Sequence, residues 1–227
     1  MKRPRGPRSP SLLRYATALI VALVIAVAPG HAQDFQSWNE VDLAAAWGRI
    51  DLLAPFVART DPSLPNPQLA ATGLTADIHL PARLTLTPGY LFADLPQAGY
   101  LVHLPLIAVT ATLHPGRLTV ADRNRFEKLI GYPGSPVRYR NRLLFDYPIR
   151  RAHAFLDDEV MFNLSTGEFN QNRLQAGAGA HLAPRLLLDF YYLRKNPASG
   201  TVTHVLGTTL RFTLTQRTAR FTPTHSP

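Results

Sequence analysis

The sequence predicts an all-β protein that closes into a transmembrane barrel, and three observations support this class. Twenty prolines and fourteen glycines in 227 residues disfavour long helices. Apolar and polar residues alternate along most of the chain with the period of two that is typical of strands. The alternating runs are 10–14 residues long, enough for a tilted strand to cross a bilayer. We therefore expect a closed antiparallel up-and-down β-barrel of 10 or 12 strands after an N-terminal signal peptide.

The first 32 residues have the layout of a secretory signal peptide. Residues 1–14 hold five Lys and Arg, residues 15–28 are an apolar run, and small residues precede a cleavage site after Ala32. The apolar run is shorter than the roughly 20 residues that a membrane-spanning helix needs, which disfavours an uncleaved anchor. The predicted domains are a signal peptide (1–32), an outer-membrane β-barrel (33–214) and a disordered polar tail (215–227).

Charge and cysteine content exclude several classes of protein. The chain has no cysteine, so disulfides, thiolate metal sites and cysteine nucleophiles are excluded. Its formal net charge is +9, but the signal segment contributes five cations and no acid. From Gln33 onward, 19 Lys and Arg stand against 15 Asp and Glu, with no long basic run. Because nucleic-acid-binding proteins cluster their basic residues, we expect no nucleic-acid partner.

Eleven alternating runs follow the signal segment. In the clearest one, 172–182, leucine and alanine occupy one face while arginine, glutamine, glycine and histidine occupy the other. In order, the runs cover 38–47, 49–59, 68–80, 83–93, 100–113, 117–128, 137–149, 152–164, 170–182, 185–195 and 202–214. Single-chain bacterial barrels usually have an even number of strands. We therefore expect one run to be split or to lie outside the wall, with 34–60 as the segment in question.

The connections between the runs alternate in length. Tight links fall at 48–49, 81–82, 115–116, 149–151 and 183–184. Longer polar loops fall at 60–67, 94–99, 129–136, 165–169 and 196–201. Short turns at one end of a barrel and longer loops at the other are typical of outer-membrane proteins.

The two faces of the strands predict a polar lumen and an apolar exterior. Aromatic residues near run ends are expected to form an interfacial girdle, namely Trp38, Trp47, Tyr90, Phe92, Phe126, Tyr147, Phe162 and Tyr192. Buried charges need partners, so lumenal carboxylates are expected to pair with arginines. The predicted lumenal network comprises Arg123, Arg125, Glu127, Arg138, Arg140, Arg142, Glu159, Arg173, Gln175 and Asp189. Two interpretations of it stay open: a structural plug of salt bridges, and a basic constriction or anion site.

One run does not alternate cleanly. Within 117–128, Asp122 and Asn124 share a face with Leu118, Val120 and Phe126. A β-bulge in this run would change the phase and is the explanation that we consider.

Several segments resemble a known bacterial family. They are WNEVDL (38–43), DRNRFEKLIGYPGSPVRYRNRLLFDYPI (122–149), DEVMFNL (158–164), FNQNRLQAGAGAHLAPRL (169–186) and HVLGTTLRF (204–212). In these the chain resembles the family filed as domain of unknown function 2490, over nearly the whole mature sequence. The resemblance implies an outer-membrane β-barrel and lends no activity. The family's recurring residues match Arg125, Glu127, Arg138, Arg140, Arg142, Glu159, Asn172 and Arg173.

The end of the chain departs from the usual outer-membrane pattern. Such chains commonly end on an aromatic residue that the assembly machinery recognises, whereas fifteen residues follow Phe212 here. The departure puts the assembly signal in question, and not the strand that ends at this aromatic.

We find no pattern that predicts catalysis, a metal or a cofactor. The mature serines lie in loops, turns or tails without a G-x-S-x-G motif, and no histidine lies two to five residues from another. The acidic cluster 157–159 lacks calcium-loop spacing. Gly177-x-Gly179 is outside a strand–helix setting, and we expect these glycines to accommodate neighbouring arginines.

Three functions therefore remain in view. The first is a small, porin-like outer-membrane barrel with a structural or narrow-pore role and no enzymatic activity. The second is an outer-membrane hydrolase that acts on lipid, with Ser135 or Ser165 as nucleophile. The third is a soluble periplasmic barrel that binds an apolar ligand. For the first, the expected partners are outer-membrane lipid and the barrel-assembly machinery, and the expected state is a monomer.

Overall fold

The computed structural model describes residues 35–61, 63–64 and 66–215. The predicted signal peptide and residues 216–227 of the predicted tail lie outside these ranges. Within them, no helix is long and apolar enough to span a membrane. The elements are β1 (Phe35–Trp47), β2 (Ile50–Thr60), β3 (Leu69–His79), η1 (Pro81–Arg83), β4 (Leu84–Leu95), β5 (Tyr100–Leu113), β6 (Thr119–Lys128), β7 (Val137–Ile149), β8 (Ala152–Asn163), β9 (Glu168–Ala183), β10 (Leu186–Pro197) and β11 (Thr203–Thr213).

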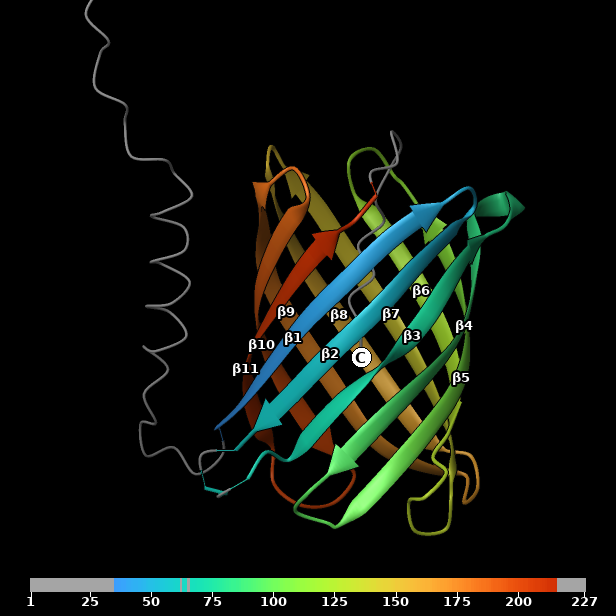
Figure 1. The fold of residues 1–227 in the computed structure, drawn as a ribbon, viewed down its shortest axis with the longest axis vertical. Coiled ribbons are helices and arrows are strands. Elements are labelled where there is room, and N and C mark those ends of the chain that lie inside the picture. The colour runs from blue at the N-terminus through green and yellow to red at the C-terminus, as the bar shows by residue number, and fades with distance from the viewer. Residues whose placement is uncertain (1–34, 62, 65, 216–227) are drawn as a thin grey trace, which may run out of the picture. The chain divides into compact units, whose positions relative to one another are not determined.

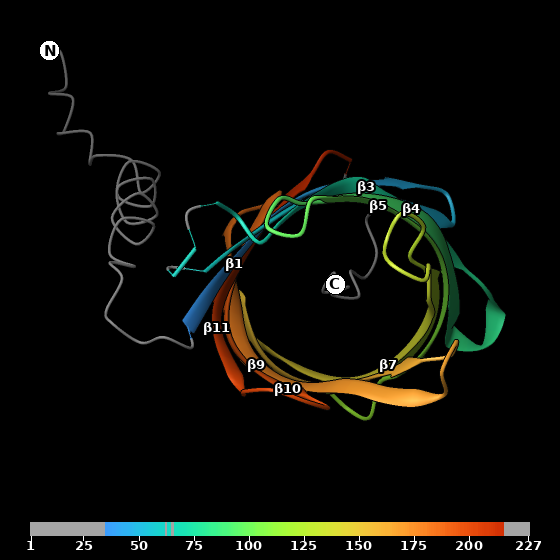
Figure 2. The ribbon, with the colours of Figure 1, turned by 90° about the horizontal axis from the view of Figure 1, so that it is seen from below.

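The eleven strands form one closed barrel (Figure 1, Figure 2). Each strand pairs with its neighbour in sequence in antiparallel fashion, and β1 closes the ring by pairing with β11. Closure leaves no sheet edge, so the backbone N–H and C=O groups along the strands find partners within the sheet. The prediction of an all-β closed barrel is confirmed, and the predicted number of 10 or 12 strands is wrong.

The β1–β11 seam explains the error in strand number. An odd number of up-and-down strands makes the first and last strands run in the same direction, and these two pair in parallel from Phe35↔His204 to Ala44↔Thr213. A buried ion pair crosses the seam, with Arg211 donating to Asp42 Oδ2 at 2.6 and 3.0 Å. The first run is therefore an ordinary wall strand, neither split nor excluded.

The connections alternate between the two ends of the barrel, and those at one end are shorter on average. The end that holds the short connections 48–49, 80–83, 114–118, 150–151 and 184–185 is called the turn end below. The opposite end holds 61–68, 96–99, 129–136, 164–167 and 198–202 and is called the loop end. Gly48 makes the first tight turn with φ +58°, a conformation that glycine adopts without steric cost.

Strand alternation places charge inside the barrel and apolar side chains outside it. Asp42, Glu127 and Arg211 on the inner face are at most 2% exposed. On the outer face, Phe56, Leu74 and Ile107 are 48%, 52% and 48% exposed. This polarity is the reverse of a soluble β-barrel, which hides its apolar face and exposes the polar one.

The outer face of β6 and β7 also carries a short polar ladder. The register between β5, β6 and β7 is continuous, so the bulge considered for run 117–128 is absent from these pairings. Asp122 and Asn124 face outward and are bonded to neighbours: Asn141 donates to Asp122 Oδ1 at 2.6 Å, and the Tyr139 hydroxyl donates to Asn124 Oδ1 at 2.5 Å. These bonds satisfy polar groups that the apolar exterior would otherwise leave without partners.

The predicted aromatic girdle is wrong at one residue. Trp47, Tyr90, Phe126, Tyr147 and Tyr192 are exposed on the outside of the barrel. Trp38 is only 4% exposed, because it shares the inward phase of Glu40 and Asp42 on β1. It belongs to the wall of the lumen.

Candidate functional site

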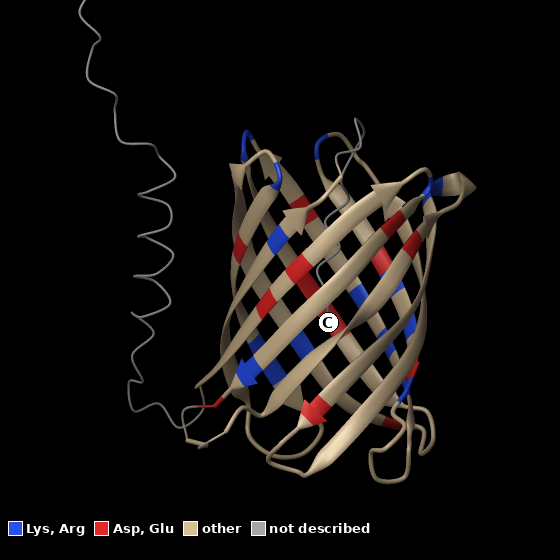
Figure 3. Cartoon of the chain, viewed as in Figure 1, with Lys and Arg blue, Asp and Glu red and all other residues tan. Residues whose placement is uncertain are grey.

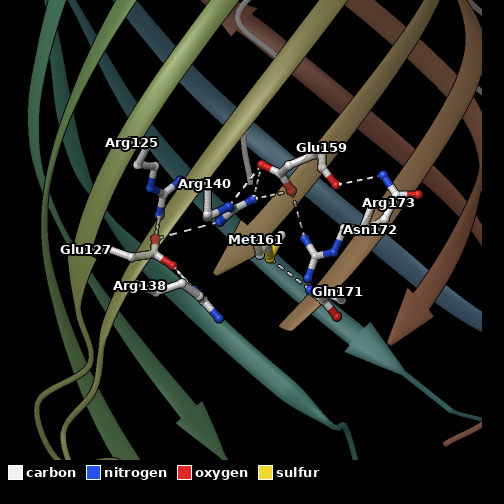
Figure 4. Close-up of polar contacts among 9 residues, drawn as sticks. All are labelled: Arg125, Glu127, Arg138, Arg140, Glu159, Met161, Gln171, Asn172 and Arg173. Carbon is white, nitrogen blue, oxygen red and sulfur yellow. Dashed lines mark hydrogen bonds and ion pairs between the residues drawn. The ribbon is translucent and has the colours of Figure 1, made fainter. Parts of the chain in front are cut away.

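A dense ionic network occupies the inner faces of β6 and β7 (Figure 4). Two register pairs, Arg125↔Arg140 and Glu127↔Arg138, lie next to each other across these strands. Glu127 forms an ion pair with Arg125 at 2.6 Å, lies 3.7 Å from Arg140, and also pairs with Arg138. One carboxylate thus holds three guanidinium groups in a site where it is almost fully buried.

Glu159 on β8 extends the network toward β9. Its two carboxylate oxygens accept from Arg140 at 2.7–2.9 Å, and Arg173 lies 3.5 Å away. Arg140 therefore bridges Glu127 and Glu159, as Figure 4 shows. Such bidentate, buried contacts fix the side chains more firmly than exposed ion pairs do.

Beyond Arg173, further basic side chains lie close to one another. Arg173 and Lys195 lie directly opposite each other on β9 and β10, an arrangement that repels. Lys195 makes no ion pair with another described residue, whereas Arg173 has Glu159 at 3.5 Å. Arg59 from β2 approaches the same region, with its guanidinium carbon 3.9 Å from the centre of the Trp38 ring, and that of Arg173 is 5.1 Å from it.

These cations border a cavity of about 410 Å³ in the loop half of the lumen, which we call the chamber. Its cationic residues are Arg59, Arg125, Arg138, Arg140, Arg173 and Lys195, and no Asp or Glu is among the described residues that line it. The remaining wall is mainly apolar and comes from β3, β4, β5 and the loop after β6. Toward the middle of the lumen, the space beside Arg123 and Arg125 falls to about 20 Å³.

The turn half of the lumen has the opposite charge. His153 lies between Asp146 and Asp189, at 2.5 and 2.9 Å. Asp77 accepts from the Thr87 hydroxyl at 2.6 Å, and Asp51 contacts His79 at 2.6 Å. In Figure 3, most acidic segments of the strands lie toward the turn end and most basic ones toward the loop end.

The ten predicted lumenal residues all lie on inward-facing positions, but they do not form a single network. Arg125, Glu127, Arg138, Arg140, Glu159 and Arg173 are joined by ion pairs. Arg142 lies opposite Arg123 and Glu159 in the strand register. Gln175 lies opposite Asp157 and Leu193. Asp189 belongs to the turn half and contacts His153 at 2.9 Å.

The expected role of the two β9 glycines is corrected by their surroundings. A Cβ at Gly177 would meet the Phe155 ring, and one at Gly179 would meet Asp189 and His153. These glycines therefore make room for an aromatic ring and for the acid–histidine cluster, and not for arginines.

Sequence analysis missed two residues that line the chamber, Arg59 and Lys195, and it misplaced Trp38, whose ring lies against Arg59 and Arg173. Each shares the inward phase of its strand, so the alternation itself held the signal. Lys195 was not assigned to the lumen because the preceding inward residues, Tyr191 and Leu193, are uncharged and did not mark this face as polar. Trp38 was assigned to the girdle because it lies close to the start of its run.

Other chemistry is less favoured by the described residues. They include no group of three or more His, Asp or Glu that could hold a metal ion. The Ser165 hydroxyl accepts from the Val137 N–H at 2.9 Å, and that of Ser135 contacts the Tyr132 carbonyl at 3.4 Å. Both hydroxyls thus serve the structure of the loops in which they lie.

A family model described as "Protein of unknown function (DUF2490)" matches residues 35–204, which span all strands up to the start of β11. The chain belongs to this family. The DUF2490 match covers every residue of the ionic network and of the chamber. The function of this family is unknown, so membership establishes the evolutionary relationship and gives no information on activity.

The chain was also compared with curated proteins and with solved structures. The search of curated proteins gave no match. Among solved structures, the DUF2490 protein is similar to an anion-selective porin from Comamonas acidovorans, with 11% sequence identity and a TM-score of 0.37. The match covers 72% of this chain and 53% of the porin, so the chain spans about half the length of that protein.

Proposed function

We propose that this protein is an outer-membrane β-barrel that binds anions in the chamber. The membrane placement is supported by the closed sheet, by strands of 10–16 residues and by the apolar exterior around a charged lumen. Fractionation and heat-modifiable gel mobility test it. Recovery with soluble periplasmic proteins would contradict it and would favour the periplasmic barrel.

The observation that supports anion binding most strongly is the lining of the chamber. Six cationic side chains surround a cavity of about 410 Å³ without a lining carboxylate among the described residues. Four of these cations pair with Glu127 or Glu159, whereas Lys195 has no ion-pair partner among the described residues and lies opposite Arg173. Cations close together in a low-dielectric setting repel one another, so Lys195 calls for a counter-charge. An anion among Arg59, Arg173 and Lys195 would supply this charge and accept several charge-assisted hydrogen bonds.

The ionic network makes the chamber a binding site more than an open channel. Glu127 and Glu159 hold Arg125 and Arg140 in place on the inner faces of β6, β7 and β8, and a separate pocket beside Arg123 and Arg125 measures about 20 Å³. In planar bilayers we therefore expect at most a small, anion-preferring conductance. Cation preference would contradict the proposal, as would hydrolysis of lipid that is lost on replacing Ser165.

Binding can be tested with a fluorescence reporter inside the chamber wall. The chain has two tryptophans, so Trp47→Phe leaves Trp38 as the reporter. In nanodiscs of zwitterionic lipid, inorganic phosphate should change the Trp38 emission saturably. Lys195→Gln should weaken the apparent affinity about tenfold, as expected for a lost charge-assisted hydrogen bond.

Arg194→Gln is the matched control for that test. Arg194 precedes Lys195 on β10 but points outward and is exposed. It removes the same formal charge without touching the chamber, so it should leave phosphate binding unchanged. Equal effects of the two substitutions, or no saturable response in the Trp38 reporter, would refute anion binding in the chamber.

A further inference from the structure

The apolar wall of the chamber is not explained by binding of a simple anion. Water-filled barrels have polar interiors. Here Leu91, Ala93, Val102, Leu104 and Leu129 are at most 8% exposed and form one cluster on the lumenal side. Leu69, Ala71, Leu95 and Tyr100 pack against this cluster.

The two chemistries occupy different sectors of the barrel. The apolar sector comes mainly from β3, β4 and β5, with Pro55 and Val57 added by β2. Arg59, Arg173 and Lys195 come from β2, β9 and β10. Arg125, Arg138 and Arg140 on β6 and β7 complete the basic sector. A molecule in the cavity would therefore contact apolar side chains on one flank and guanidinium or ammonium groups on the other.

The loop after β6 completes the apolar sector at the loop end. Ile130 and His103 exchange backbone hydrogen bonds of 2.8 and 2.9 Å, which hold this loop against β5. Tyr132 stacks edge-on against Tyr100 at 5.7 Å, and it lines the cavity together with Pro136. Gly131 has φ +91°, and a Cβ there would meet the Leu101 carbonyl, so glycine permits this close approach.

From this two-sided lining we infer that the ligand is an amphipathic anion, namely a single-chain carboxylate. Its carboxylate head contacts Arg59, Arg173 and Lys195, and its apolar chain lies against the wall that contains Leu91 and Leu104. This inference rests on the proposed function and names its ligand class. A cavity of about 410 Å³ falls in the range of pockets that hold small organic ligands. Burial of the chain removes apolar surface from water, and the cations neutralise the head.

Decanoate is the probe. Inorganic phosphate provides a negative charge without an apolar chain, and decanol provides the apolar chain without a charge. The Trp47→Phe protein in zwitterionic nanodiscs reports through Trp38. The Trp38→Phe protein, which keeps the exposed Trp47, reports any decanoate that only enters the lipid. We expect a saturable Trp38 response with an affinity for decanoate at least about tenfold above that for phosphate or decanol.

Variants of each sector separate the contributions. Lys195→Gln should weaken decanoate binding about tenfold, and Leu104→Thr, which makes the apolar wall polar with a strand-compatible residue, should weaken it severalfold. Leu101→Thr is the control for the second change, because Leu101 precedes Val102 on the outer face and is 57% exposed. Heat-modifiable mobility of each variant verifies that the barrel has folded before binding is compared.

The outcomes distinguish this inference from the proposed function. Phosphate binding as tight as decanoate binding, with no effect of Leu104→Thr, would overturn the amphipathic ligand and leave anion binding standing. Decanol binding that equals decanoate binding and ignores Lys195→Gln would overturn both. Preferential decanoate binding that responds to both sectors and not to Arg194→Gln or Leu101→Thr would support both.

Discussion

The two halves of the lumen are built on the same strands with the same alternation of inward and outward residues. They differ in how their charged side chains are paired. In the turn half, Asp42 pairs with Arg211 and His153 contacts two aspartates. In the loop half, cations line a cavity of about 410 Å³, and Lys195 has no ion-pair partner among the described residues. The turn half therefore resembles a packed protein core, whereas the loop half resembles a binding site for an anion.

The difference shows that alternation alone does not decide what a lumen does. Charged side chains that bond each other hold the barrel together in the turn half, where the cavity beside Asp51 and Arg211 measures about 60 Å³. Unbalanced charges beside a cavity cost stability unless a ligand completes them. Substitutions in the turn half should thus act mainly on stability, and those in the chamber mainly on binding.

The largest effect is expected from Arg211→Met in the turn half. Asp42 is fully buried, so the loss of its partner leaves a carboxylate without compensation at the β1–β11 seam. The free energy of unfolding should fall by about 3 kcal/mol. Urea titration, with the folded fraction read from heat-modifiable mobility, measures it.

The Asp42→Asn/Arg211→Met double variant is the control for the seam. It removes both charges, so it should be more stable than Arg211→Met alone. If the Arg211→Met variant has the same urea midpoint of unfolding as the unsubstituted protein, the stability of the seam does not depend on this pair.

Glu159→Gln should move stability and binding in opposite directions. It removes the carboxylate that contacts Arg140 and Arg173, which should cost about 2 kcal/mol of unfolding free energy. The chamber then carries more uncompensated positive charge, so phosphate should bind severalfold more tightly. Glu168→Gln, at the exposed start of β9, should change neither quantity. Weaker phosphate binding in Glu159→Gln would show that the carboxylate serves the ligand.

The smallest stability effect is expected from Lys195→Gln in the chamber. Because Lys195 opposes Arg173 across β9 and β10, its replacement relieves a repulsion and should raise the stability of the ligand-free protein by up to about 0.5 kcal/mol. The same variant loses phosphate affinity about tenfold. A clear loss of stability in the absence of ligand would place Lys195 with the structural charges of the turn half.

Much of this architecture follows from the sequence, because a barrel wall forces strict alternation. The run predicted at 137–149 coincides with β7, and the run at 152–164 ends one residue beyond β8. Most inward arginines of β6 and β7 were predicted because they alternate with outward-facing apolar residues such as Phe126, Leu143 and Phe145.

The rest depends on which strands meet. The even-number rule failed because β1 and β11 can pair in parallel, and residues so far apart in sequence give no local sign of it. The apolar wall was not predicted because leucines on both faces of β4 and β5 give no contrast between lumen and lipid. The chamber then forms where β2, β9 and β10 meet that wall.

Anomalous diffraction from bromide-soaked crystals tests the central claim most directly. The chamber predicts a bromide peak among Arg59, Arg173 and Lys195 that disappears in Lys195→Gln and persists in Arg194→Gln. Bromide that binds only outside the lumen, or a cavity that takes up rubidium in place of bromide, would contradict the account.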